Sequence, residues 1–179
     1  MPEEKVQVSP VESQKDEPVL DEARLQMFLR QARQEQNLGR AILAGTGAAI
    51  VGAIVWALIT HFTGFQIGWM AVGIGFIVAY TVRMVGQGID KPFAIAGSVL
   101  ALAGCILGNF LTSCIFIAEA QEMALTEVLR LGLNPPIFIE IMIASFSPMD
   151  LVFYGIAVYE GYRWSLRKIT EEEIARLKK

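Results

Sequence analysis

The sequence predicts an all-α polytopic membrane protein with four transmembrane helices, an amphipathic N-terminal helix and a helical outer cap between spans three and four. Of the 179 residues, 54% are hydrophobic, and they are grouped in long blocks that contain few of the charged residues. The longest block, residues 93–118, has no acidic or basic side chain apart from two cysteines. At about 1.5 Å per residue this block exceeds the roughly 30 Å hydrocarbon layer.

Composition also limits the expected partners. The formal net charge is only −3 and most charges flank the apolar blocks, so we expect the lipid bilayer as a partner and no nucleic acid. Cys105 and Cys114 lie nine residues apart on one predicted helix, about 13 Å along its axis, which is too far for a disulfide. The acidic N-terminus has no apolar core before Ala41, so we expect the first span to direct insertion.

The N-terminal region divides into two predicted parts. Residues 1–20 are rich in polar residues without periodicity, and we expect a disordered acidic tail. Residues 21–39 place Leu25, Phe28 and Leu29 on one helical face, which predicts an amphipathic cytoplasmic helix. This helix either binds a membrane surface or partner, or is a solvated extension of the first span.

The first three spans are predicted at about 41–61, 67–83 and 93–118, and each has a face of small residues that lets another backbone approach closely. These packing residues are Gly45, Ala49 and Ala53 in the first span, Ala71 and Gly75 in the second, and Gly97, Ala101, Gly104 and Gly108 in the third. In the third span, we expect the opposite face to contact lipid. That face consists of Ile95, Val99, Leu102, Ile106 and Phe110.

Residues 119–147 are predicted to form the outer cap. A helix beginning near residue 118 should end at Gly132, because Asn134, Pro135 and Pro136 follow. The apolar segment 137–146 is too short to cross, which leaves an interfacial or a re-entrant position open. The acidic residues of the cap are Glu119, Glu122, Glu127 and Glu140.

The fourth span is predicted at about 148–165, within a membrane domain of residues 40–168. Ser147 should cap this helix, with Pro148 in its first turn and Asp150 as the capping-box partner. Glu160 is either an intramembrane ion site or, as we prefer, the partner of Arg163. Residues 169–179 form a charged cytoplasmic tail that contains a second capping box, predicted by the spacing of Thr170 and Glu173.

Three segments resemble a group of small bacterial four-span membrane proteins of uncharacterised function. They are GWMAVGIGFIVAYTVR, LAGCILGNFLTS and FSPMDLVFYGIAVYEGYRWSLRK, and the resemblance covers roughly residues 66–169. It implies four spans in a bacterial inner membrane, and it implies no activity, substrate or catalytic residue.

The sequence is compatible with two different classes of function. We expect a non-enzymatic integral membrane protein that acts by helix packing and by assembly with itself or a membrane partner, although the small residues would equally serve packing within one chain. The alternative is a small oligomeric transporter or ion-conducting protein, with Asn109 and Glu160 as its polar site and the acidic cap as a vestibule. An enzyme is disfavoured because the only histidine, His61, lies at a turn, and we expect no catalytic residue, cofactor or metal site.

The distribution of basic residues predicts the topology. Fourteen of the fifteen Lys and Arg residues fall on one side of a four-span arrangement, and only Arg130 falls on the other. Because basic residues accumulate on the cytoplasmic side of a membrane, both termini are predicted to be cytoplasmic. In a variant without Cys105 and Cys114, Glu12→Cys and Ala175→Cys should therefore be shielded from an impermeant thiol reagent in intact cells, whereas Glu122→Cys should be labelled. Labelling of all three positions would reject cytoplasmic termini.

Overall fold

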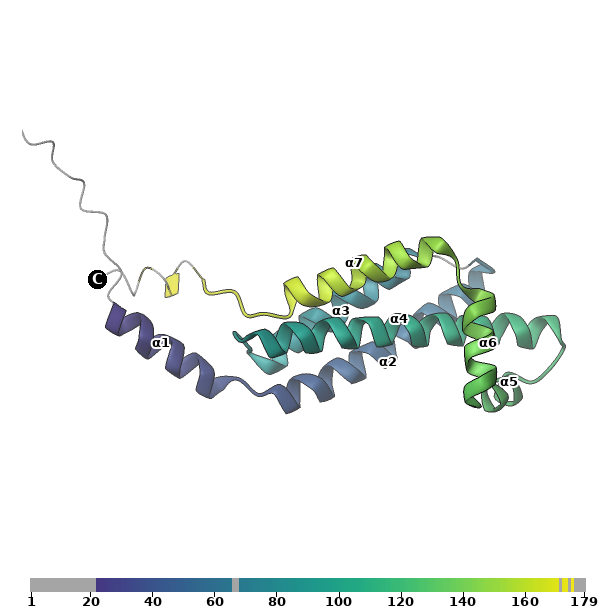
Figure 1. Ribbon diagram of the computed structural model, residues 1–179, viewed down its shortest axis with the longest axis horizontal. Coiled ribbons are helices and arrows are strands. Elements are labelled where there is room, and N and C mark those ends of the chain that lie inside the picture. The colour runs from purple at the N-terminus through teal and green to yellow at the C-terminus, as the bar shows by residue number, and fades with distance from the viewer. Residues whose placement is uncertain (1–21, 66–67, 171, 174, 176–179) are drawn as a thin grey trace, which may run out of the picture. The chain divides into compact units, whose positions relative to one another are not determined.

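A computed structural model describes residues 22–65, 68–170, 172, 173 and 175, and this part of the chain is all-α, as predicted (Figure 1). Its helices are α1 (Glu22–Glu35), α2 (Leu38–Thr63), α3 (Trp69–Gly86), α4 (Lys91–Ala120), α5 (Leu125–Gly132), α6 (Pro135–Ser145) and α7 (Pro148–Trp164). The predicted tail of residues 1–20 lies outside the described residues.

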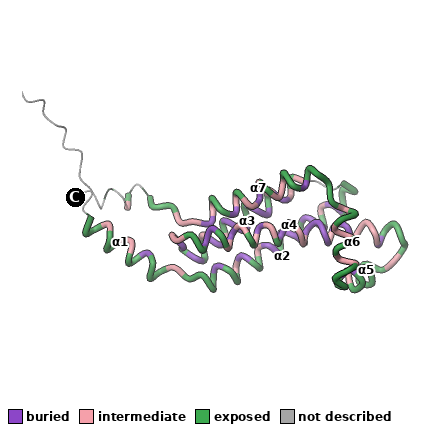
Figure 2. The backbone as a smooth tube through the Cα atoms, viewed as in Figure 1, coloured by how far each residue is buried: buried purple, intermediate pink, exposed green. Residues whose placement is uncertain are grey.

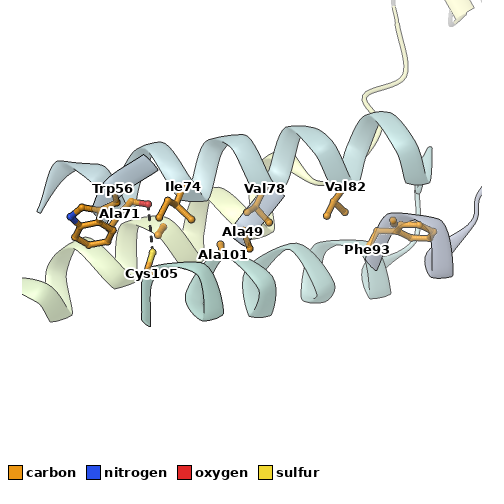
Figure 3. Close-up of a cluster of buried hydrophobic side chains, with 11 residues drawn as sticks. Ala49, Trp56, Ala71, Ile74, Val78, Val82, Phe93, Ala101 and Cys105 are labelled. Carbon is orange, nitrogen blue, oxygen red and sulfur yellow. Dashed lines mark hydrogen bonds between the residues drawn. The ribbon is translucent and has the colours of Figure 1, made fainter. Parts of the chain in front are cut away.

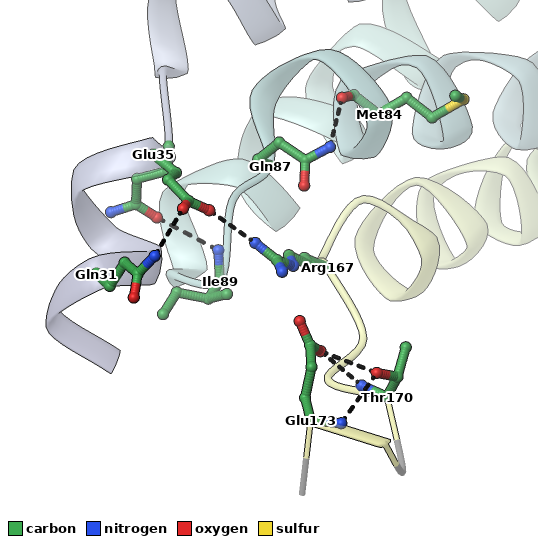
Figure 4. A network of polar contacts seen from close by, with 9 residues as sticks. Gln31, Glu35, Met84, Gln87, Ile89, Arg167, Thr170 and Glu173 are labelled. Atoms are coloured by element: carbon green, nitrogen blue, oxygen red, sulfur yellow. Dashed lines mark hydrogen bonds and ion pairs between the residues drawn. The ribbon is translucent and has the colours of Figure 1, made fainter. Parts of the chain in front are cut away.

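The chain consists of two compact units. One comprises residues 1–28 and 169–179, and its described part includes the predicted C-terminal capping box: the Thr170 amide donates to Glu173 Oε2 at 2.9 Å, and the Glu173 amide donates to Thr170 Oγ1 at 3.3 Å (Figure 4). The other unit comprises residues 29–168 and holds α2 to α7. Helix α1 begins in the first unit and ends in the second.

Within the larger unit, α2, α3, α4 and α7 form a helical bundle. The two central helices, α3 and α4, pack against each other, and each also packs against α2 and α7. Figure 2 shows the buried residues concentrated along these four helices, whereas α6 has no buried residue. The α5–α6 segment (residues 125–145) packs against α4.

Three helices, α2, α3 and α4, are long and apolar enough to cross a membrane. Their ends lie within three residues of the predicted spans. Helices α5 and α6 are together apolar enough as well but are bent by 107°, as in a broken span or a re-entrant loop, so the described residues hold three candidate spans, or four with this pair. Helix α7 is not one of the candidates, because its 17 residues extend only about 25 Å and include charged side chains.

Small residues allow the bundle helices to approach closely. A Cβ atom at Gly75 would lie 2.8 Å from the Ala157 Cα atom, and one at Gly161 would lie 2.8 Å from the Gly97 carbonyl oxygen. These are contacts with backbone, which cannot move aside as a side chain can. The bundle therefore holds α7 against α3 and α4 at positions where any side chain larger than hydrogen would push the helices apart.

Large apolar side chains fill the bundle between these close approaches. The core contains Trp56, Ile74, Val78, Val82 and Phe93, which interleave with alanines from α2, α3 and α4 (Figure 3). A Cβ atom at Gly108 would lie 2.6 Å from the Trp56 ring, so Trp56 occupies the space that this glycine leaves open. Glycine and tryptophan thus act as one complementary pair between α4 and α2.

Polar contacts join three chain segments at one end of the bundle, namely the end of α1, the loop between α3 and α4, and the residues after α7 (Figure 4). The Gln36 side chain donates to Asp90 Oδ2 at 2.6 Å and accepts from the Ile89 amide at 3.3 Å. Arg167 Nη1 lies 3.2 Å from Glu35 Oε2, and the Arg167 amide donates to the Gly88 carbonyl at 2.8 Å. The loop between α3 and α4 is therefore held by residues that precede α2 and follow α7.

The helix ends follow local chemistry that the sequence partly predicts. The Ser147–Asp150 capping box is confirmed, because the Ser147 amide donates to Asp150 Oδ2 at 2.8 Å. Gly64 ends α2 with φ of 69°, a left-handed conformation that glycine adopts without strain. The predicted helix 21–39 is too long: α1 ends at Glu35, since the Asn37 side chain accepts from the Arg40 amide and caps α2 instead.

Two further predictions about α4 are wrong. Phe110 is not on a lipid face but is only 4% exposed, because it lies under α6 with its ring 5.0 Å from that of Phe138. The helix expected from residue 118 to Gly132 is interrupted after Ala120. Glu122 there adopts φ of 54°, and α5 starts only at Leu125.

Two glycines on α3 provide a matched test of the bundle. A Cβ atom at Gly75 meets the Ala157 backbone, whereas one at Gly73 meets nothing within 4 Å. Gly75→Ala should therefore destabilise the protein by about 1–3 kcal/mol and lower its melting temperature in mild detergent, and Gly73→Ala should not. Equal melting temperatures for the two variants would contradict the close contact of α3 with α7.

Candidate functional site

The most distinctive feature outside the bundle is the α5–α6 segment, which a second apolar cluster fixes to α4. The buried residues of this cluster are Phe110, Cys114, Ala118 and Val128. Gly132, at the end of α5, approaches Phe110 so closely that a Cβ atom there would lie 2.8 Å from the ring. The second half of α4 is therefore buried by α5 and α6 as well as by the bundle.

An open cavity of about 570 Å³ lies between the second half of α4, α5 and α6. Apolar side chains from all three helices line it, among them Phe116 on α4, Val128 on α5 and Ile141 on α6. Its size is within the range of about 300–1,000 Å³ that is usual for small-molecule sites. It is the strongest candidate for a binding site in the described part of the chain.

Three polar side chains line this cavity. Ser113 and Ser145 each donate their hydroxyl proton to a backbone carbonyl one helical turn earlier, at 2.8 Å in both cases. Glu140, on α6, is exposed and is the one charged residue among the lining residues that the structure describes. All three side chains therefore offer hydrogen-bond acceptors to a ligand, since a hydroxyl whose proton is engaged can only accept.

The acidic residues predicted for a cap are all exposed but do not share one site. Glu140 is at the cavity, Glu122 is in the turn after α4, and Glu127 is on α5. Glu119 Oε1 lies 2.8 Å from His61 Nδ1, a contact between the ends of α4 and α2 that the sequence analysis missed. This pair lines a smaller apolar pocket of about 320 Å³.

A second group of polar residues lies inside the bundle. Asn109, which is fully buried, donates to the Tyr154 hydroxyl at 3.0 Å and so links α4 to α7. Trp56 Nε1, Thr60 Oγ1 and Thr112 Oγ1 are also buried and, within the described residues, have no hydrogen-bond partner. The interior of the bundle is therefore more polar between α2 and α4 than the sequence analysis expected.

Glu160 does not form the predicted ion pair with Arg163. Arg163 Nη1 donates instead to the Tyr159 hydroxyl at 2.6 Å, and its guanidinium lies 5.8 Å from the centre of the same ring. Glu160 Oε2 is buried and has no hydrogen-bond partner within the described residues. Asn109, the other residue of the predicted polar site, donates to Tyr154, which lies six residues before Glu160 on α7.

The nine small residues predicted to pack helices are all buried. Gly45 faces Leu100 and Val82, and Gly104 faces Ile74 and Ala49, so these positions contact neighbours in the same chain.

The residues that the structure describes contain no group of three or more His, Cys, Asp or Glu side chains placed to hold one metal ion. Comparison with protein-family models, curated proteins and solved structures finds no match to this chain.

Neither the cavity nor the role of Tyr154 was predicted from the sequence. Asn109, Ser113 and Ile117 recur at every fourth residue of α4, a spacing that would have placed the two polar residues and a cavity residue on one face. The packing of α6 against α4, which forms one wall of the cavity, depends on the turn between α5 and α6, and no periodic pattern in the sequence indicates it.

The Asn109–Tyr154 hydrogen bond can be tested by removing the acceptor. Tyr154→Phe should lower the free energy of unfolding by about 1 kcal/mol, because a buried amide donor then loses its partner. Tyr162→Phe, at a position that is 47% exposed on the same helix, is the control and should leave the melting temperature in detergent unchanged. Equal effects of the two substitutions would show that the bond contributes no stability.

Proposed function

We propose that α2, α3, α4 and α7 cross a bacterial inner membrane as four spans, with both termini in the cytoplasm. The packing of α7 against α3 and α4 supports its placement as a span, since both neighbours are apolar enough to cross. At about 25 Å, α7 is short, which flanking side chains and local bilayer thinning can accommodate. Lys168 lies 4.0 Å from the Trp164 ring centre, a pairing suited to a membrane interface.

In the same proposal, the α5–α6 segment caps the outer ends of the spans. Figure 1 shows α6 lying across α4 rather than along it. With α4 near the membrane normal, α6 then lies in the plane of the bilayer, which favours the interfacial over the re-entrant position. Its apolar side chains and the exposed Glu140 fit a boundary between lipid and water better than either phase alone.

The proposed function is that of a non-enzymatic membrane protein that acts by assembly with a second copy or with another membrane protein. The supporting observation is that the small residues are used within the chain, whereas α6 has no buried residue and exposes Ile139 at 55% and Ile143 at 72%. An apolar helix whose side chains are exposed and that lies outside the bundle is a candidate contact surface for a partner in the membrane.

Crosslinking from α6 tests this assembly. In a background without Cys105 and Cys114, Ile143→Cys should crosslink, to itself through a bifunctional thiol reagent or to a partner through an attached photoreactive group. Leu43→Cys on α2 is the matched control, because Leu43 is 76% exposed and should contact only lipid. A monomeric mass in mild detergent, together with no crosslink at residue 143 in native membranes, would contradict assembly.

One observation favours the alternative of an oligomeric transporter or ion-conducting protein. Buried polar atoms that have no hydrogen-bond partner in the described part of the chain occur on α2 and α4 at Trp56, Thr60 and Thr112, and on α7 at Glu160. Polar groups inside a membrane bundle are a feature of conduction paths. An ion-flux assay in liposomes, comparing the wild type with Glu160→Gln, distinguishes this candidate from assembly alone.

A further inference from the structure

We propose that the cavity between α4, α5 and α6 binds one acyl chain of a phospholipid whose headgroup carries a primary ammonium group, with Glu140 as the acceptor for that group. This inference depends on the proposed membrane location of α4 but not on assembly through α6. The predicted ligand class is therefore a phosphatidylethanolamine-type lipid, whose headgroup has N–H donors that phosphatidylcholine and phosphatidylglycerol lack.

The lining of the cavity supports an acyl chain as the buried part of the ligand. Phe116 and Ile117 form the α4 wall, Val128 and Leu131 the α5 wall, and Ile137 and Ile141 the α6 wall. Such a surface packs against apolar ligand groups, and the volume of about 570 Å³ is that of a small-molecule site. In a membrane, the apolar molecules next to α4 are lipid chains.

The polar groups select the headgroup. Glu140 supplies a carboxylate, and the hydroxyl protons of Ser113 and Ser145 are engaged by backbone carbonyls. Among the described lining residues, a ligand in this cavity therefore meets polar side chains that offer acceptors and one negative charge, and none that offers a free donor. A primary ammonium group, with three donors and a positive charge, fits this arrangement. The glycerol group of phosphatidylglycerol has hydroxyl donors but no positive charge to complement the Glu140 carboxylate.

The charge of the surrounding segment acts in the same direction. From the last turn of α4 to the start of α7, the acidic residues Glu119, Glu122, Glu127 and Glu140 outnumber the single basic residue, Arg130. Arg130 is exposed on α5 and does not line the cavity. An anionic lipid such as phosphatidylglycerol would be repelled by this segment, so headgroup charge and donor number both favour the ammonium lipid.

Native mass spectrometry of the full chain tests the proposal. The protein is reconstituted in vesicles with equal amounts of dioleoyl phosphatidylethanolamine, phosphatidylcholine and phosphatidylglycerol, and is then released in mild detergent. The amount of ethanolamine lipid bound should be about fivefold that of the choline lipid, whose trimethylammonium group has no N–H donor. Its ratio to the amount of bound glycerol lipid should be larger still. Equal binding of all three lipids would overturn the proposal.

Two substitutions assign the effect to this cavity. Glu140→Gln should reduce binding of the ethanolamine lipid to the level of the choline lipid, and Glu122→Gln, at an exposed position outside the lining, should not. Ala144→Phe places a ring in the cavity and should weaken all three lipids, whereas Ala103→Phe, at an exposed position on α4, should not. An ethanolamine preference that survives Glu140→Gln would overturn the proposal, even if Ala144→Phe fails to fold.

Discussion

Contact between backbones at small residues is the constraint on which the bundle depends. Gly75 meets the backbone of Ala157, and Gly97 meets Gly161, so α7 is held against both central helices without intervening side chains. In a lipid environment this packing is decisive, because lipid chains are as apolar as the helix surfaces and the hydrophobic effect does not drive helices together. Complementary shape, with Trp56 over Gly108, provides the remaining attraction between α2 and α4.

The same helix, α4, supports both parts of the larger unit. Its 30 residues, about 45 Å, carry bundle contacts along the first half and into the second, where the α5–α6 contacts are added. Asn109 marks the transition, since it binds Tyr154 of the bundle while Phe110 beside it packs under α6. The cavity exists because α6 crosses α4 instead of running along it, leaving space that the short α5 does not fill (Figure 1).

The all-α class and the apolar helices could be predicted because hydrophobic length and helix-ending residues are local properties. Ser147, Asp150, Thr170 and Glu173 lie where capping chemistry places them. The burial of Phe110, the His61–Glu119 pair and the cavity could not be predicted, because each depends on segments distant in sequence. Glu160 was assigned to Arg163 by spacing alone, whereas the nearby Tyr159 hydroxyl is the partner that Arg163 uses.

The arrangement of the bundle has a consequence for the order in which it forms during synthesis. Helices α2, α3 and α4 emerge first and can pair through two short loops, leaving Gly75 and Gly97 open along a groove. Helix α7, the least apolar of the four, emerges last and enters a groove that already exists. The charged residues of α7 are therefore compatible with its place in the bundle, because α7 packs on a surface that the earlier helices supply.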